Sequence, residues 1–123
     1  MKTRGFESLE VYRLAERLAD EIWNCVTGWG NLAKDTVGKQ IIRAADSVGA
    51  NLAEGSGRGT YQDNRRFIRM ARASLYETRH WLRRAYQRQL IAEINIAKLK
   101  SLVDELGPRL NAYLASIGPV SNK

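Results

Sequence analysis

The spacing of the helix breakers limits the folds open to this chain more than any other feature. Only two prolines occur in its 123 residues, and glycines cluster at Gly28–Gly30, Gly55–Gly59 and Gly107. Between these points apolar residues recur every three or four positions, which is the period of a helix with one buried face. The pattern predicts an all-α chain with four helices over about residues 8–27, 35–54, 60–88 and 92–117.

Short connections between long helices favour an antiparallel up-down-up-down four-helix bundle. The 123 residues suffice for one such domain, which we expect to span residues 1–123. Thr60 stands where the N-cap of the third helix is expected, with Asp63 in its first turn. Gly107 and Pro108 interrupt the fourth helix, where we expect a kink, or a break followed by another short helix.

The third predicted helix carries a line of basic side chains, called the arginine ladder below. At about 100° per residue, its members fall within roughly 40° of one line, which is about 27 Å long. They are Arg65, Arg69, Arg72, Arg79 and Arg83, with Tyr76 in the gap. Between residues 61 and 88, eight arginines against Asp63 and Glu77 give +6 of the chain's net charge of +7. We expect the ladder to lie roughly opposite the apolar face of its helix, directed to solvent or to another chain.

The ladder points to two kinds of partner. Guanidinium groups pair with phosphate through two parallel hydrogen bonds, which favours RNA or DNA, and Tyr76 is the candidate for stacking on a base. The same face could instead pair with acidic side chains of a neighbouring subunit. Candidates for that role lie on the first helix: Glu10, Glu16, Asp20 and Glu21. Trp23 and Trp81 lie on or beside apolar faces and are expected to be packing residues rather than base-binding ones.

A line of polar residues is predicted beside the apolar face of the second helix. Its members fall within about 60° of one direction: Gln40, Arg43, Ser47, Asn51 and Glu54. Buried polar groups need partners, and Ser74 and Glu77 of the third helix are the candidates, with Arg43–Glu77 as the expected pair. We interpret the set as a structural polar network, because no nucleophile–base pair accompanies it. The chain is therefore expected not to be an enzyme.

The residue content narrows the remaining chemistry. Cys25 is the only cysteine and His80 the only histidine, so we expect no internal disulfide, no metal site and no cofactor. No run of about 18 apolar residues is present, and no apolar run follows Met1. Neither a membrane span nor a secretory signal is therefore expected. These features are typical of a cytoplasmic protein.

The stretch from Gly38 to Arg58 resembles the signature of four-helix-bundle proteins encoded in intervening sequences of bacterial large-subunit ribosomal RNA genes. The similarity covers about residues 6–114, with further matches at Phe6, Tyr12, Ala15, Phe67, Ala71, Ser74 and Glu77. The resemblance implies a left-handed bundle that assembles as a homopentamer, in a family without established enzymatic activity. That family is related to accessory proteins of diversity-generating retroelements, which form basic barrels and bind nucleic acid and a reverse transcriptase.

The residues and the resemblance together predict a non-enzymatic, basic, oligomeric protein that binds nucleic acid or acts as an adaptor. Its possible partners are RNA, DNA and a protein such as a reverse transcriptase. The alternative is a structural self-assembling protein whose arginine ladder pairs with acidic residues of neighbouring subunits. Family members differ in surface charge, so the ladder is a property of this chain and not of the family signature.

Overall fold

The computed structural model describes residues 5–119, and the regular elements in that range are all helical. In chain order they are η1 (Phe6–Ser8), α1 (Glu10–Val26), α2 (Asn31–Ala33), the π-helical η2 (Lys34–Gly38), α3 (Lys39–Ser56), α4 (Tyr61–Gln87) and α5 (Glu93–Ser116). The elements α2, η2 and α3 follow one another without a gap and form one long segment. The prediction of an all-α four-helix bundle is confirmed.

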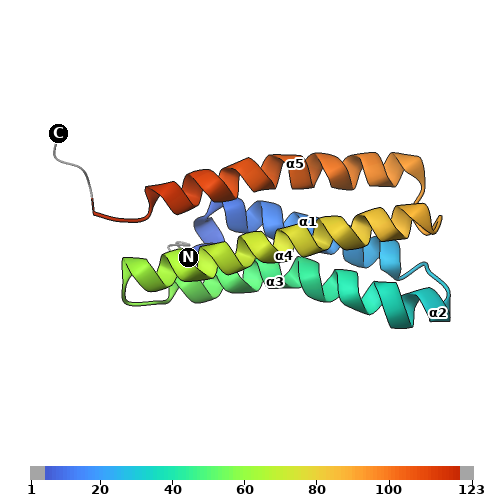
Figure 1. Ribbon diagram of the computed structural model, residues 1–123, viewed down its shortest axis with the longest axis horizontal. Helices are drawn as coiled ribbons and strands as arrows, with labels where there is room; N and C mark the ends of the chain where they lie inside the picture. The colour runs from blue at the N-terminus through green and yellow to red at the C-terminus, as the bar shows by residue number, and fades with distance from the viewer. Residues whose placement is uncertain (1–4, 120–123) are drawn as a thin grey trace.

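The four long segments lie side by side along the long axis of the molecule, and the chain turns back at each end (Figure 1). Around the bundle α1 contacts α3, α3 contacts α4, α4 contacts α5, and α5 contacts α1. The helix that carries the arginine ladder, α4, therefore lies between α3 and α5. The seam between α4 and α5 is one place where ladder side chains can reach another element.

The core is formed by the apolar faces that the helical period predicts. All four segments contribute large aliphatic side chains that are almost completely buried: Leu18, Ile22, Ile41, Val48, Leu52, Ile68, Leu99, Leu106 and Leu110. Burial of each such side chain stabilises the fold by about 1.5–3 kcal/mol. Thr78 is a buried polar residue on α4, and its hydroxyl donates to the carbonyl of Ser74 at 2.8 Å. The hydroxyl is therefore buried with its hydrogen bond satisfied, as buried polar groups require.

The second segment begins at Asn31, before the predicted start near residue 35. The first turn buries no apolar side chain: its leucine, Leu32, is 81% exposed. Apolar periodicity therefore does not extend into this turn, which explains why the sequence pattern missed it. Gly38 ends the π-helical turn at a point of close approach. A Cβ at this position would lie 2.8 Å from Cγ1 of Val26 and 3.2 Å from the carbonyl oxygen of Ala33. The glycine therefore allows the end of α1 to pack directly against this segment.

The connection between α3 and α4 begins later than the glycines suggest. Gly55 belongs to α3 and is buried, because α4 packs directly against it: a Cβ there would lie 2.9 Å from the Cβ of Phe67. The helix continues to Ser56 before the chain turns. Thr60 then caps α4, and its hydroxyl oxygen accepts from the amide of Asp63 at 3.1 Å. The predicted N-cap is confirmed.

The fourth predicted helix is not broken at Gly107 and Pro108, because α5 runs through Pro108 to Ser116. A proline cannot donate to the carbonyl four residues earlier, and here that carbonyl belongs to the exposed residue Asp104. Leu106 and Leu110, on either side of the proline, are completely buried. Their packing holds both halves of the helix against the core, so the expected break is wrong, while the expected kink stays a prediction.

Candidate nucleic-acid interface

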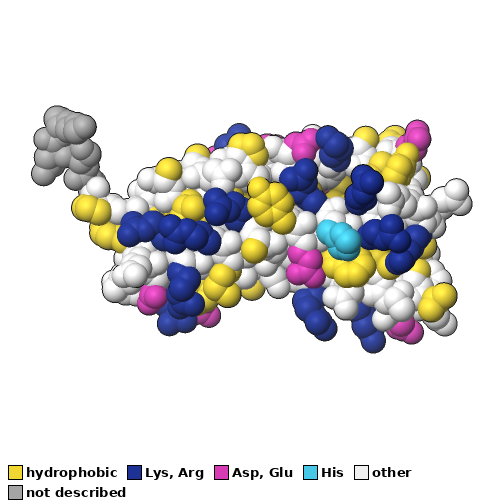
Figure 2. Space-filling model, in the orientation of Figure 1, with side chains coloured by type: hydrophobic (Ala, Val, Ile, Leu, Met, Phe, Trp, Pro, Cys, Tyr) yellow, Lys and Arg dark blue, Asp and Glu magenta, His cyan; other side chains and the backbone are white. Residues whose placement is uncertain are grey.

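The arginine ladder and Tyr76 all lie on α4. Basic side chains follow this helix across the front of the molecule, with the histidine among them (Figure 2). The buried residues of α4, however, centre only about 115° from the ladder at 100° per residue, and not opposite it. Long side chains at that angle can reach over the neighbouring helix.

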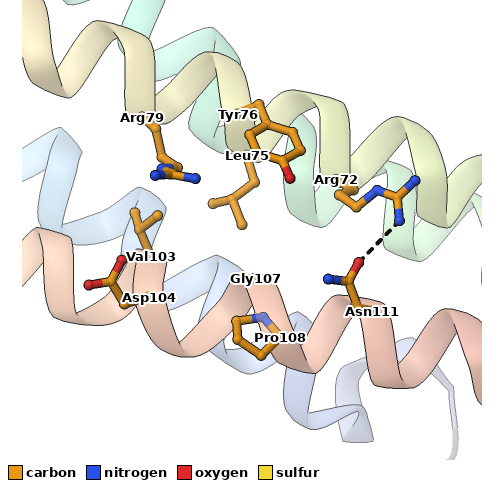
Figure 3. A pocket seen from close by; sticks show the side chains of 9 residues that line it. All are labelled: Arg72, Leu75, Tyr76, Arg79, Val103, Asp104, Gly107, Pro108 and Asn111. Carbon is orange, nitrogen blue, oxygen red and sulfur yellow. Dashed lines mark hydrogen bonds between the residues drawn. The ribbon is translucent and has the colours of Figure 1, made fainter.

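Two ladder arginines do so. Nη1 of Arg65 donates to the carbonyl oxygen of Ile117 at 2.7 Å, and Nη1 of Arg72 donates to Oδ1 of Asn111 at 3.1 Å (Figure 3). Both arginines are half-buried. The expectation that the whole ladder points to solvent or another chain is therefore wrong for these two, because α5 lies beside the ladder and supplies acceptors.

The other ladder arginines are exposed. Arg69 and Arg83 make no hydrogen bond or ion pair with other residues in the range 5–119. The guanidinium of Arg79 lies 5.8 Å from the centre of the Tyr76 ring, which is a cation–π distance. Tyr76 itself is 61% exposed. These four side chains form the part of the ladder that is open to a ligand.

A groove runs along the seam of α4 and α5 and is called the α4/α5 groove below. It consists of two hollows that share Tyr76, Arg79, Val103 and Asp104. The first, of about 340 Å³, is shown in Figure 3 and is completed by Arg72, Leu75, Gly107, Pro108 and Asn111. The second, of about 700 Å³, is completed by His80, Leu82, Arg83, Tyr86, Ile96 and Lys100. Tyr76 therefore stands where the two hollows meet.

The charge of this groove is positive. Its lining holds four cationic side chains and one carboxylate, which are Arg72, Arg79, Arg83, Lys100 and Asp104. Nζ of Lys100 donates to Oδ2 of Asp104 at 2.9 Å, so the carboxylate is already paired. Three arginines, the exposed tyrosines Tyr76 and Tyr86 and a partly apolar floor remain, and together they can bind phosphate groups and stack on an aromatic ring.

The contribution of α5 to this groove was not predicted. Lys100, Asp104 and Asn111 are spaced by four and seven residues, so they share one face of their helix. That spacing is visible in the sequence and could have identified a polar face on α5. It could not show that this face lies beside the arginine ladder. The up-down-up-down order predicts that α4 and α5 are neighbours, but the helical period does not say on which side of α4 the last helix packs.

The predicted polar line on α3 does not form one network across helices. Its contacts, and those of its candidate partners, lie mainly within single helices or between close neighbours in the chain. The contacts are Asn51 Nδ2 to the carbonyl of Ser47 (2.8 Å), Arg58 with Glu54 (3.5 Å), Thr78 to the carbonyl of Ser74 (2.8 Å) and Trp81 Nε1 to Glu77 (3.2 Å). Gln40 is half-buried.

The expected Arg43–Glu77 ion pair is absent from the described range. Glu77 instead accepts from the indole N–H of Trp81, which lies one turn further along α4. Arg43 is exposed. A donor on the same helix has therefore taken the place of the expected donor on α3.

Trp23 and Trp81 differ in how far they are buried. Trp81 is half-buried and packs against the core, as expected, whereas Trp23 is 55% exposed. Trp23 follows Ile22, which is the centre of the buried face of α1, and one residue rotates a side chain by about 100°. The expectation that Trp23 is a packing residue is therefore wrong.

A separate hollow lies between α1 and α3, away from the α4/α5 groove, and its charge is negative. It measures about 360 Å³ and its lining includes Glu16, Asp20 and Asp46. Burial, followed by the neighbouring Asp20 carboxylate, raises the pKa of Asp46 above the usual aspartate range. Burial and Glu16 likewise raise the pKa of Tyr12, whose hydroxyl donates to Glu16 at 3.4 Å. This surface is called the α1/α3 hollow below.

The four acidic residues predicted as partners of the ladder are not equally available. Arg109 of α5 pairs with Glu10 at 2.7 Å, and Lys98 of α5 pairs with Glu21 at 3.0 Å. Both are thus used within the chain. Glu16 and Asp20 remain at the α1/α3 hollow.

Two kinds of feature, a membrane-spanning helix and a metal-binding group, are absent from residues 5–119. None of its helices has the length and apolar character needed to cross a membrane. Within the same range, no three side chains of His, Cys, Asp or Glu come together as a group able to hold a metal ion.

Comparison with known proteins gives a family and a fold. The chain is similar to a crystal structure of a protein with unknown function from the S23 ribosomal protein family of Bacteroides thetaiotaomicron VPI-5482, with a TM-score of 0.76 and 20% identity. The match covers 86% of this chain and 99% of that one. A search of curated proteins found no significant match. The family model of the 23S rRNA-intervening sequence proteins matches residues 7–112, and the chain therefore belongs to that family.

Proposed function

We propose that this protein is a non-enzymatic, oligomeric adaptor that binds nucleic acid through the exposed ladder arginines and the α4/α5 groove. The observation that carries the proposal is the groove itself, in which the exposed Tyr76 lies beside Arg79 and between Arg72 and Arg83. The polar residues of α3 support a role without catalysis, because Asn51 and Glu54 make their contacts within or next to their own helix.

In this proposal the arginines bind phosphate groups and give little base specificity by themselves. The resemblance to ring-forming proteins supports a homopentamer, in which five copies of the groove act together. We place it in the cytoplasm, because the sequence has no apolar run long enough for a membrane span. Avidity then turns weak contacts of one groove into tight binding by the ring. A protein partner such as a reverse transcriptase would dock on the same assembly.

Binding should depend steeply on salt, because each neutralised phosphate releases counterions. We expect the affinity for RNA or DNA of mixed sequence, measured by fluorescence anisotropy, to fall more than about tenfold between about 50 and 200 mM salt. The triple variant Arg69→Glu, Arg79→Glu, Arg83→Glu should lose this binding. It retains Arg65 and Arg72, which hold α4 against α5, so its melting temperature should be close to that of the wild type.

A matched control carries the same change of charge elsewhere. Arg17, Lys39 and Arg43 are exposed residues of α1 and α3, and their replacement by Glu should reduce affinity much less than the ladder variant does. Equal loss in both variants would show that net charge and not the ladder drives binding. Absence of salt-sensitive binding in the wild type would refute the proposal.

A second candidate function is self-assembly, and the α1/α3 hollow favours it. Glu16, Asp20 and Asp46 could receive the exposed ladder arginines of a neighbouring copy. Desolvation and the nearby Asp20 carboxylate raise the pKa of Asp46, and a guanidinium group placed at this hollow would lower it again. In this alternative, the ladder variant would lose its oligomer rather than its nucleic acid.

A further inference from the structure

We infer that the α4/α5 groove selects single-stranded over duplex nucleic acid by stacking an unpaired base on Tyr76. This inference rests on the proposed function and names the form of nucleic acid that the same site takes. It follows from the position of one aromatic ring, the size of the groove and the distribution of charge along it.

The first observation is the position of Tyr76. Single exposed aromatic residues are common on protein surfaces, so exposure alone carries no weight. Tyr76, however, is shared by both hollows, and a guanidinium group lies 5.8 Å from the centre of its ring. A base could stack on the Tyr76 ring, which already makes a cation–π contact with Arg79. The phosphates of the bound strand would then lie in the hollows on either side of the ring.

The second observation is the shape of the site. The larger hollow, of about 700 Å³, has Leu82 and Val103 in its lining, both nearly buried in the core. A cavity of this size holds a small organic molecule, and a nucleobase with its sugar is of that class. The hollow lies between two neighbouring helices, whose axes in such packing are about 8–10 Å apart. A whole α-helix fits into the major groove of a duplex, so a duplex is too wide to enter the hollow, whereas a single strand can.

The third observation is the distribution of charge. Arg72 and Arg83 lie on either side of Tyr76 along α4 and are separated by about 16 Å. This spacing allows contacts to the phosphates of a few successive nucleotides around one stacked base. Lys100 and Asp104 of the opposite wall neutralise each other, so the phosphate contacts come from α4. A duplex could touch these arginines too, but its paired bases would not reach the tyrosine.

The experiment compares an unstructured 12-nucleotide strand with a 12-base-pair duplex by fluorescence anisotropy at one salt concentration. We expect Tyr76→Ser to weaken binding of the single strand about tenfold and binding of the duplex less than about twofold. Tyr76→Phe should bind as the wild type does, because the ring and not the hydroxyl makes the contact. A strand that carries 2-aminopurine should show quenched fluorescence with the wild type and Tyr76→Phe, but not with Tyr76→Ser.

Tyr61 provides the matched control. It lies on the same helix and is 54% exposed, but it does not line the groove. Tyr61→Ser should leave the preference for single strands unchanged. Circular dichroism melts of all variants show whether the fold is retained.

The outcomes separate this inference from the proposed function. If strand and duplex bind equally and Tyr76→Ser changes neither, the inference fails while binding by the ladder stands. If neither ligand binds in a salt-dependent way, both fail. If an acidic peptide displaces the strand and binds more tightly in a Tyr76-dependent manner, the groove is a protein-docking site and the inference is overturned.

Discussion

Gly55 and Gly59 belong to one glycine-rich stretch but meet different surroundings. A Cβ on Gly55 would lie 2.9 Å from the Cβ of Phe67 and 3.2 Å from the carbonyl oxygen of Asn64. Both atoms are fixed by the backbone of α4. At Gly59 nothing lies within 4 Å of the same position. The first glycine therefore permits two helices to approach, whereas the second lies in open space.

This difference predicts opposite effects of the same substitution. Gly55→Ala should lower the free energy of unfolding by about 1–2 kcal/mol, because α3 and α4 must separate to admit the methyl group. Gly59→Ala should leave it unchanged or raise it by up to about 1 kcal/mol, because alanine restricts the unfolded chain. Urea unfolding followed by circular dichroism measures both. A Gly55→Ala variant as stable as Gly59→Ala would contradict the close packing of this pair of helices.

At the scale of the elements, the helical period predicted the existence of the four segments and much of the core. Leu18, Ile41 and Leu106 lie on predicted apolar faces or at their spacing, and all are buried. The predicted direction of the ladder is wrong for Arg65 and Arg72, because it depends on the side of α4 against which α5 packs. Arg65 and Arg69 illustrate this limit: they are one turn apart, but only Arg65 reaches the carbonyl of Ile117.

Pro108 shows a second limit of the same kind. A local rule predicted a break, and the burial of Leu106 and Leu110 overrode it. Local sequence describes the cost of a proline in a helix, whereas the packing energy that outweighs it comes from contacts with the neighbouring helices α1 and α4. The same reason explains the α4/α5 groove, since part of its lining comes from α5 and not from the helix that carries the ladder.

The cost of that proline is open to measurement. Pro108→Ala restores a hydrogen-bond donor to the interior of α5 and should raise the free energy of unfolding by about 1–2 kcal/mol. This is the helix penalty of proline less the loss of its stiffening effect on the unfolded chain. Pro119→Ala, beyond the end of α5, should change it by less than about 0.5 kcal/mol. Equal denaturant midpoints for Pro108→Ala and the wild type would show that the helix has already absorbed the strain.

At the scale of the whole molecule, the bundle carries surfaces of opposite charge on different helix pairs. The α4/α5 groove is positive, and the α1/α3 hollow is negative. Such a molecule can bind a polyanion at one surface, or it can join copies of itself with the positive surface of one against the negative surface of the next. Charge alone permits both functions. They are separated by the effect of each substitution on the molar mass of the oligomer and on the affinity for nucleic acid.

The last prediction separates them by reversal of charge. In the proposed function, the ladder variant Arg69→Glu, Arg79→Glu, Arg83→Glu keeps the molar mass of the wild-type oligomer and loses nucleic acid. Size-exclusion chromatography with light scattering measures the mass against that of the 13.9 kDa chain. A second variant, Glu16→Lys, Asp20→Lys, Asp46→Lys, reverses the α1/α3 hollow and should keep both mass and binding. Glu10 and Glu21 stay unchanged in it, because they pair with α5.

Self-assembly through the ladder requires the opposite pattern. Each triple variant would then place like charges against each other at the joint between subunits and dissociate to the monomer, since like charges in contact across an interface are strongly unfavourable. An equimolar mixture of the two variants would pair Glu with Lys at some joints and recover complexes larger than the monomer. Recovery on mixing, in proteins that are monomeric alone, cannot arise from a groove that only binds nucleic acid. It would therefore assign the ladder to the subunit interface.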